Sequence, residues 1–503
     1  MRWMESLLDQ IDRMTNSFHL GRGLDAKTVQ PVGWEAHEEA IRVMRRSYAE
    51  IPAQQRIRLG KTTSNVFRAR TTSTATLDVS GLRGVIAIDP VERTADVQGM
   101  CTYEDLVDAT LPFGLSPTVV PQLKTITLGG AVTGMGVEST SFCQGLPHEA
   151  VEEMDIFTGT GDILTCSAHH NVDLFRSFPN SYGSLGYALR LKIHLVPISP
   201  VVELRHVRCH SSDKAANLLE SIATTKSYQG LDVEFLDGVA FSPTEIYLSL
   251  GRGVAEGQPL SDYTRQRIYY RSLQHPTGIL RDYLSIRDYF WRWDPDWFWC
   301  SRAFGVQHPR IRKLWPRDLL RSNIYWKLID WDRKYNIADR LEARAGRPAR
   351  ERVVQDIEVT CDRLPEFLEW FFQASDIQPV WLCPIQLRDG VDDLIAQGTL
   401  TKESPHPWPL YPLDSRSLWV NVGFWSSVPV NLLGDDAGPG AFNRLIEHKV
   451  KDLGGHKSLY SESFYSESEF KELYGGDIPE KLKSIYDPQG RFLRLYEKTV
   501  GGS

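Results

Sequence analysis

The chain of 503 residues has little of what marks a membrane-spanning, secreted or zinc-binding protein. No uninterrupted apolar segment approaches the roughly 18–20 residues that cross a bilayer as a helix. The seven cysteines are spread singly, are odd in number and form no C-x-x-C pair. This usage excludes a disulfide framework and argues against a zinc site. We therefore expect reduced thiols, no bound metal and a cytoplasmic location.

The chain also lacks the charge pattern of a nucleic-acid binder and the layout of a signal peptide. The net charge is −7, and Lys and Arg are scattered rather than clustered. Acidic residues interrupt the first twenty residues, and no small-residue cleavage site comes after them. Apolar residues recur there at helical spacing, from Leu7 to Phe18. This segment predicts a helix that docks on the body or lies in a membrane interface.

A Rossmann fingerprint is missing as well, although glycine is plentiful. That fingerprint needs G-x-G-x-x-G where a strand meets a helix. Gly134-Met-Gly136 lacks the third glycine at the right offset, and the turn Gly159–Asp162 lies inside a predicted hairpin, "EEMDIFTGTGDILTCS". A Rossmann NAD domain is therefore rejected.

What is present is a series of short α/β elements around two glycine clusters. Residues 84–100 predict two strands, "YEDLVDATLPFGL" a helix that Gly114 ends, and "NVDLFRSF" a short helix capped by Asn171. The clusters are "TLGGAVTGMGVESTSFCQGL" and "SYGSLG", the second running into an alternating strand. Such glycines either permit tight turns or let backbone N–H groups approach a pyrophosphate.

The most unusual stretch is 289–299, "YFWRWDPDWFW", in which seven of eleven residues are aromatic. Asp294-Pro295 divides it, so it is not one helix. Two interpretations stay open. It is an insert packed on a sheet, or it is a lid over an elongated apolar pocket whose basic and aromatic rim also touches a lipid surface. The second interpretation makes Trp291, Trp297 and Tyr325 substrate contacts and adds peripheral membrane contact.

The order of elements resembles the FAD-binding domain of the vanillyl-alcohol-oxidase superfamily, the FAD-binding PCMH-type flavoproteins. The segment "PQLKTITLGGAVTGMGVESTSFCQGLPHEAV" is similar to the flavin loop of the delta-24 sterol reductases within it. Similar segments continue in the same order: "HHNVDLFRSFPNSYGSLG", "VEFLDGVAFS", "VVQDIEV", "PVWLCPIQL" and "LYSESFYSESEFKELYGG". They cover most of the chain from about residue 56.

The resemblance implies an α+β fold: a two-lobed FAD-binding PCMH-type domain and a substrate domain with an antiparallel sheet covered by helices. The expected parts are a helical extension (1–55), the FAD domain (56–200), the substrate domain (201–450) and a C-terminal segment (451–503) that returns to the FAD domain. The strands "TEIYLSLG", "RVVQDIEVT", "PVWLCPIQL" and "LWVNVGFW" would build the substrate-domain sheet, with "SDKAANLLESIATT" and "LPEFLEWFFQA" as its helices.

The resemblance also implies a set of FAD contacts. They would lie in the loop of the first lobe, in the long glycine loop and in the turn before the last strand. The residues are Lys61, Thr62, Ser64, Asn65, Gly129, Gly130, Gly134, Gly136, Ser139, Gly145, Gly183, Leu185, Gly186 and Ile193. Many superfamily members tether FAD through His or Cys. "KTTSNVFR" holds no His and "PQLKTITLGG" no Cys, so we expect non-covalent FAD.

The implied activity is reduction of an isolated C=C bond in a lipophilic small molecule, with NADPH or NADH as donor. A sterol or isoprenoid side chain and a methylene-branched acyl chain are both candidate substrates. The alternatives are an FAD oxidase or dehydrogenase of an alcohol or sugar carbon, and a flavin protein that only carries lipid. Sugar-oxidising relatives use a lysine where this chain has Ser463. The sequence indicates neither an oligomeric state nor a choice between NADPH and NADH.

Reduction of an isolated alkene needs a hydride at one carbon, a proton at the other and a dry site that stabilises positive charge. The candidate proton donors are Tyr460, Glu462, Tyr465 and Glu138. Gln355 and Glu358, on the strand "RVVQDIEV", are predicted to face the substrate.

Overall fold

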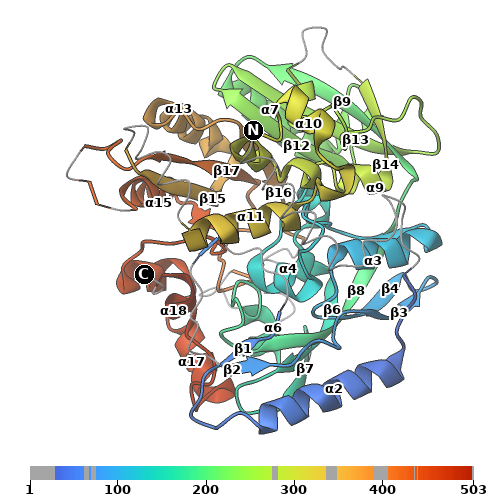
Figure 1. The fold of residues 1–503 in the computed structure, drawn as a ribbon, viewed down its shortest axis with the longest axis vertical. Coiled ribbons are helices and arrows are strands. Elements are labelled where there is room, and N and C mark those ends of the chain that lie inside the picture. Colours follow the sequence, from blue (N-terminus) through green and yellow to red (C-terminus); the bar gives the residue numbers. More distant parts are fainter. Residues whose placement is uncertain are drawn as a thin grey trace.

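The protein is described by a computed structural model that covers 29–61, 67–68, 75–274, 281–335, 348–388, 406–434, 437–438 and 440–500 (Figure 1). The helix predicted near the N-terminus and the predicted contacts Thr62, Ser64 and Asn65 lie outside these residues. Within the described part of the chain, no helix is long and apolar enough to cross a membrane.

The lower half of the molecule in Figure 1 is built on an antiparallel sheet whose strands differ in length. Its strand order is β3-β4-β8-β6-β7, and β5 pairs with the far end of β8. β8 is the long central strand, and its apolar residues alternate into the core. The strands are β3 (Val85–Asp89), β4 (Thr94–Gln98), β5 (Leu115–Pro117), β6 (Val151–Phe157), β7 (Ile163–Ser167) and β8 (Tyr187–Pro197).

Short helices connect these strands: α3 (Tyr103–Thr110), α4 (Leu128–Gly134), α5 (Ser141–Gln144) and α6 (Val172–Ser177). The sequence predicts α3 and α6, whereas α4 and α5 form within the glycine cluster, for which no helix is predicted. Thr102 caps α3 by accepting from the Asp105 N–H. The predicted cap Asn171 is different: it starts α6 in a left-handed conformation, and its side-chain amide donates to the Thr165 carbonyl instead. Its role is therefore to hold the preceding hairpin.

A first small lobe joins this sheet from one edge. It consists of α2 (Trp34–Ala49) and the parallel pair β1 (Ile57–Leu59) and β2 (Ala75–Leu77). Met44, Ile57 and Leu77 close a separate small core there, together with Phe492 from the other end of the chain. The first lobe and the C-terminus therefore stabilise each other.

The upper half of the molecule is an eight-stranded sheet in which every described pair is antiparallel. The order is β14-β9-β13-β12-β16-β17-β15-β18. The strands are β9 (Val201–Cys209), β12 (Phe235–Ser242), β13 (Glu245–Val254), β14 (Arg281–Ser285), β15 (Arg350–Thr360), β16 (Val380–Ile385), β17 (Trp419–Pro429) and β18 (His456–Lys457). A short hairpin, β10 (Ser227–Tyr228) and β11 (Leu231–Asp232), stands beside it.

Helices cover one face of this sheet and aromatic segments cover the other. On the first face α7 (Ser212–Thr225), α13 (Leu364–Ala374) and α15 (Ala441–Asp452) bury a hydrophobic core of aliphatic and phenylalanine side chains. On the second face lie the aromatic stretch and its neighbouring short helices. They are α8 (Tyr269–Ser272), α9 (Ile286–Phe290), η3 (Asp294–Asp296), η4 (Cys300–Phe304), α10 (Pro309–Leu314), η5 (Arg317–Leu319) and α11 (Ser322–Tyr335).

The C-terminal segment crosses from the upper sheet to the lower half (Figure 1). β18 extends the large sheet, and Ser461 then pairs with Phe67 of the first lobe. The segment continues as α16 (Glu467–Leu473), α17 (Ile478–Tyr486) and α18 (Leu495–Thr499). Further on, Ile57 donates its N–H to the Arg491 carbonyl at 2.8 Å. The α+β prediction, with an antiparallel sheet covered by helices, is confirmed.

Candidate functional site: a glycine-lined cavity between the two sheets

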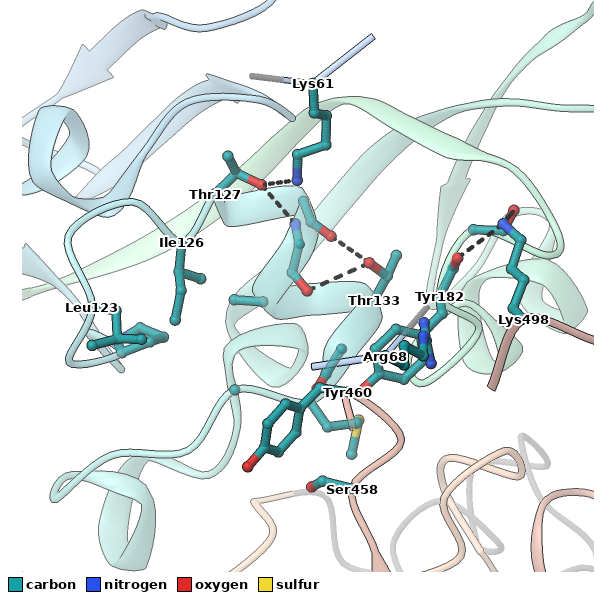
Figure 2. A pocket seen from close by; sticks show the side chains of 18 of the residues that line it. Lys61, Arg68, Leu123, Ile126, Thr127, Thr133, Tyr182, Ser458, Tyr460 and Lys498 are labelled. Carbon is teal, nitrogen blue, oxygen red and sulfur yellow. Dashed lines mark hydrogen bonds between the residues drawn. The ribbon is translucent and has the colours of Figure 1, made fainter. Parts of the chain in front are cut away.

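A cavity of about 370 Å³ lies where the first lobe, the lower half, the upper sheet and the C-terminal segment meet. Figure 2 shows part of its wall, with Lys61 above Thr127 at one side and Tyr460 and Ser458 at the other. Its lining combines glycines and cations with a cluster of aromatic rings and a carboxyl group.

Glycine backbone forms much of the lower wall. Gly129 and Gly130 lie in the first turn of α4, and a methyl group on Gly129 would lie 2.7 Å from the Gly99 carbonyl oxygen. The Gly129 N–H donates to that same oxygen at 3.0 Å, so glycine is needed for α4 to pack this closely on the end of β4. The lining glycines are Gly129, Gly130, Gly134, Gly136, Gly183 and Gly186.

The start of α4 is held by Thr127 and Lys61. The Thr127 hydroxyl accepts from the Gly130 N–H at 3.2 Å, which is a normal N-cap. Lys61 Nζ lies 3.1 Å from the same hydroxyl oxygen (Figure 2). The lysine of the first lobe therefore reaches the glycine loop across the cavity edge.

Positive charge predominates among the ionisable residues that line the cavity. The cations are Arg58, Lys61, Arg68 and Lys498, and the carboxyl groups are Asp356 and Glu497. A glycine backbone wall with this charge suits an anionic ligand that needs close backbone approach, such as a diphosphate.

Part of the lining is aromatic and includes one partly buried carboxyl group. Phe298, Trp381 and Trp425 line it together with Tyr460 and Asp356. Burial raises the pKa of Asp356 to about 7, although the nearby Tyr460 and Asn421 side chains favour its ionised form. The Tyr460 hydroxyl accepts from the Trp425 indole N–H at 2.8 Å, and burial raises the pKa of Tyr460 well above its usual value. The Asp356 carboxyl group and the Tyr460 hydroxyl therefore lie together among the aromatic side chains of the cavity lining.

The register of β15 explains why Asp356, rather than Gln355, faces the cavity. Successive strand residues point to opposite faces. Gln355 lies on the helix-covered face, fully buried, and its amide donates to Asn443 Oδ1 of α15 at 2.6 Å. The prediction that Gln355 faces the substrate is therefore wrong. Asp356 lies opposite Gly423 of β17, whose missing side chain leaves room for the carboxyl group.

Glu358 shares the face of Asp356 but lies behind the wall. Its carboxylate accepts from the Ser458 hydroxyl at 3.1 Å and from the Tyr411 hydroxyl. Ser458 lines the cavity, whereas Glu358 is not among the lining residues. Glu358 therefore supports the loop Ser458–Tyr460 through its hydrogen bond to Ser458.

Glu138 is held in a buried ion cluster one layer away from the cavity. The Arg292 guanidinium, with no exposed surface, donates to Glu138 Oε1 at 2.9 Å and to Asp237 Oδ2 at 2.7 Å. Asp237 also accepts from the Trp381 indole N–H at 3.1 Å, and Trp381 lines the cavity. Burial raises the pKa of Glu138 despite Arg292. The cluster therefore holds the Trp381 side chain in place, although none of its three charged residues lines the cavity.

The remaining predicted proton donors lie elsewhere. Glu462 is exposed, and its carbonyl accepts from the Lys457 ammonium. Tyr465 is buried beside Tyr474, and its carbonyl accepts from the Tyr496 hydroxyl at 3.3 Å. Of the four predicted donors, Tyr460 is the one that lines the cavity.

The predicted FAD contacts divide in a similar way. Lys61 and the six glycines named above line the cavity. Ser139 accepts from the Tyr289 hydroxyl at 2.9 Å, and Gly145 lies against Glu149. Leu185 and Ile193 are buried in the core of the lower sheet. None of these four residues is among those that line the cavity.

The aromatic stretch turns out to be mostly protein core. Trp297 has no exposed surface and stacks on Phe67 (5.5 Å between ring centroids) and Tyr325 (6.2 Å). Trp291 is buried too, and the Tyr325 hydroxyl donates to the Pro295 carbonyl at 2.8 Å. Phe298 is the residue of this stretch that lines the cavity. Trp291, Trp297 and Tyr325 lie behind the wall. In this packing they do not contact a substrate in the cavity, so the prediction that they do is not supported.

Sequence reasoning missed Asp356, Asn421, Arg68 and Lys498 in the lining. Asp356 could have been found, since Val353 and Ile357 are apolar and strand alternation assigns Gln355 to their face. Lys498 carries no local signal, because its position depends on the return of the C-terminal segment.

Comparison with known proteins agrees with this site. Residues 28–167 match the FAD binding domain family. Delta(24)-sterol reductase of Arabidopsis thaliana is 23% identical over 454 residues, which is 85% of this chain and 76% of that protein. The human delta(24)-sterol reductase is 23% identical over 432 residues, 83% of this chain and 76% of that protein. Cytokinin dehydrogenase 7 of rice, Oryza sativa subsp. japonica, is 32% identical over 162 residues, 32% of this chain and 29% of that protein.

The residues of the cavity fit FAD. The glycine wall permits close backbone approach, and the four cations complement a diphosphate. The chain is an FAD-dependent oxidoreductase of the PCMH-type FAD-binding superfamily. Within it, the chain is similar to the delta(24)-sterol reductases over most of its length.

We expect Gly130→Leu to yield protein that has lost most of its FAD and its yellow colour. Gly130 lines the cavity, and a methyl group there would already lie 2.9 Å from Thr127 Oγ1 and 3.6 Å from Lys61 Nζ. The ratio of flavin to protein absorbance measures the loss. Gly438→Leu is the matched control, since open space surrounds Gly438. Equal flavin content in the two purified variants would contradict the assignment of this loop.

Proposed function

We propose that this enzyme reduces an isolated C=C bond of a lipophilic substrate, with NADPH or NADH as electron donor. The observation that carries the proposal is Asp356, a carboxyl group with a pKa of about 7 set in an aromatic wall of the cavity. At neutral pH a large fraction of this group is protonated. It can therefore give a proton to an apolar ligand that offers no polar handle.

Bound FAD supplies the capacity to take a hydride from a nicotinamide donor and pass it to a substrate carbon. The proposed role of Asp356 is to protonate the other alkene carbon, with Tyr460 beside it. Tyr460 stays protonated at neutral pH, because burial raises its pKa. It favours the ionised form of Asp356, so it would stabilise the carboxylate that proton transfer leaves behind.

The rings around Asp356 would exclude water and stabilise positive charge on the substrate. Trp381, Trp425 and Phe298 line the same cavity. A cation over an aromatic face gains about 2 kcal/mol or more when it is desolvated. These rings would stabilise the carbon that becomes positive when an isolated alkene is protonated.

The FAD is proposed to be held without a covalent tether. None of the described residues that line the cavity is a histidine or a cysteine. Lys61 and the glycines Gly129, Gly130, Gly134, Gly136, Gly183 and Gly186 are the contacts that the cavity supports. Thr62, Ser64 and Asn65 stay part of the proposal on the strength of the resemblance.

The substrate class is inferred from the relatives. They are named delta(24)-sterol reductases, and an apolar cavity wall suits a sterol or isoprenoid side chain. A methylene-branched acyl chain needs the same chemistry. A lipophilic substrate is supplied from a lipid phase, so peripheral membrane contact belongs to this proposal.

Oxidation of an alcohol or sugar carbon is the second candidate. The same Asp356 carboxyl is partly ionised at neutral pH and could accept a proton from a hydroxyl group. The similarity of about a third of the chain to a cytokinin dehydrogenase also favours a dehydrogenase. The two functions differ in which small molecule reduces the enzyme.

The test is to mix the purified holoprotein anaerobically with NADPH, then with NADH, and to follow the visible absorbance of oxidised flavin. Rapid bleaching, then recolouring with a sterol or isoprenoid alkene and a product heavier by two hydrogens, is the expected result. If donor and substrate use the flavin in turn, double-reciprocal plots should be parallel. Bleaching by an alcohol but by neither nicotinamide would replace this proposal with the oxidase.

A further inference from the structure

Two cations from distant parts of the chain meet on one side of the cavity, at Tyr182 (Figure 2). The Arg68 guanidinium lies 4.7 Å from the centroid of the Tyr182 ring. Lys498 of α18 donates to the Tyr182 carbonyl at 3.1 Å and to the Gly183 carbonyl at 2.7 Å. Arg68, Tyr182, Gly183 and Lys498 all line the cavity.

The Lys498 ammonium has bonding capacity left over. An ammonium group has three N–H donors, and two neutral carbonyls account for two of them. Among the described residues, no carboxylate lies within ion-pair distance of Lys498. Lys483 of α17 makes a useful contrast, because Asp487 is its ion-pair partner. A partly buried lysine that keeps its charge without a counterion is costly, so a ligand that supplies the opposite charge would stabilise it.

The residues around the Lys498 ammonium also indicate that it lacks an opposite charge. Burial, together with the positive charges of Arg68 and Lys483, lowers the pKa of Lys498 to about 7, and Asp487 acts in the opposite direction. The Tyr187 ring lies 5.5 Å from the ammonium, and Glu497 is the acidic residue of α18 that lines the cavity. An anion in the cavity would raise the pKa again and keep Lys498 charged.

We propose that Lys498 and Arg68 form a binding site for a phosphoryl anion in the cavity wall. The anion belongs either to the FAD diphosphate or to the 2′-phosphate that distinguishes NADPH from NADH. Lys498 is carried by the last helix, so the site forms only when the C-terminal segment has docked on the turn at Tyr182–Gly183. The inference rests on the cofactor binding that the proposed function needs. It does not rest on the substrate or the direction of the reaction.

The experiment compares the wild-type holoprotein with Lys498→Met, Lys498→Arg and Lys481→Met. The last is the matched control, an exposed lysine on α17. FAD release is measured by flavin fluorescence after dilution, without turnover, so a failed reductase assay leaves this result intact. In a second arm, NADPH and NADH are titrated anaerobically against flavin absorbance.

For an FAD phosphate, Lys498→Met should raise the Kd of FAD about tenfold or more, because a hydrogen bond to a charged group contributes at least that much. For a donor phosphate, the Kd of FAD stays within about twofold, and half-saturation by NADPH rises while that by NADH does not. Either result supports the anion site. No change in either arm, with Lys498→Met equal to Lys481→Met, would overturn it.

A pH series separates charge from packing. If an anion raises the pKa of Lys498 on binding, affinity is full below about pH 7 and falls as the pH rises above it, where the free protein loses the proton. Lys498→Arg should keep the affinity and flatten this slope, since guanidinium stays charged. Asp356→Asn controls for the other group that titrates at about 7 in this cavity, and it should leave the slope in place. A wild-type slope that persists in Lys498→Arg would contradict the proposal.

Discussion

Asp356→Asn is expected to lower the rate of alkene reduction by about 10²–10⁴-fold, the usual contribution of a positioned acid. The amide fills the same space opposite Gly423 but cannot supply the proton. FAD content should not change, because Asn and Asp have the same size and the substitution alters neither the glycine wall nor the four cations of the lining. Turnover of alkene, measured alongside flavin content, checks both statements. A variant that keeps a tenth or more of the wild-type rate would show that Asp356 is not the donor.

The pH profile gives an independent test of the same residue. Burial raises the pKa of Asp356 to about 7, and the acid form is the active one in the proposed reaction. The value of kcat/KM should therefore be highest below about pH 7 and fall as the pH rises through it. The Asn variant should lose this limb of the profile. Tyr460→Phe is the companion variant: it should lower the rate less and shift the limb, because Tyr460 favours the ionised form of Asp356.

Arg292→Met should cost about 3–5 kcal/mol of folding free energy, which is typical when one partner of a buried ion pair is removed. Arg292 is fully buried between Glu138 and Asp237, and no solvent replaces its charge. The midpoint of urea unfolding measures the loss. Arg42→Met is the control, since its partner Glu39 lies on the exposed face of α2, and we expect little change.

Two further measurements identify the cause of that loss. Burial raises the folded-state pKa of Glu138 above its unfolded value, and removing Arg292 raises it more. A carboxyl group with a raised pKa favours the folded state at low pH and loses this contribution as the pH rises through the folded pKa. The deficit of Arg292→Met should therefore shrink toward acid pH. Adding Glu138→Gln and Asp237→Asn should recover stability at neutral pH. A deficit unaffected by pH or by these changes would indicate lost packing instead.

Local patterns in the sequence were sufficient for part of the elements. The β6–β7 hairpin, β8 after Gly186, the strands β13, β15, β16 and β17 and the helices α7 and α13 are where the sequence predicts them. The strands β9, β12 and β14 and the helix α15 were not predicted. The glycine loop was recognised through the family resemblance, and the structure shows one reason for its glycines in the close approach of Gly129 to Gly99. The family resemblance indicated FAD as the cofactor, and the missing Rossmann fingerprint ruled out a Rossmann NAD domain.

Which side chain faces the cavity depended on contacts between segments far apart in the chain. Gln355 and Asp356 are neighbours with similar polarity, and the pairing of β15 with β17 and α15 separates them. The aromatic stretch is core rather than lid because Phe67, Tyr325 and Trp425 surround Trp297. Lys498 reaches a carbonyl 315 residues earlier in the chain. Periodicity reports only which residues share a face, whereas burial, charge and ligand contact arise from what that face meets in three dimensions.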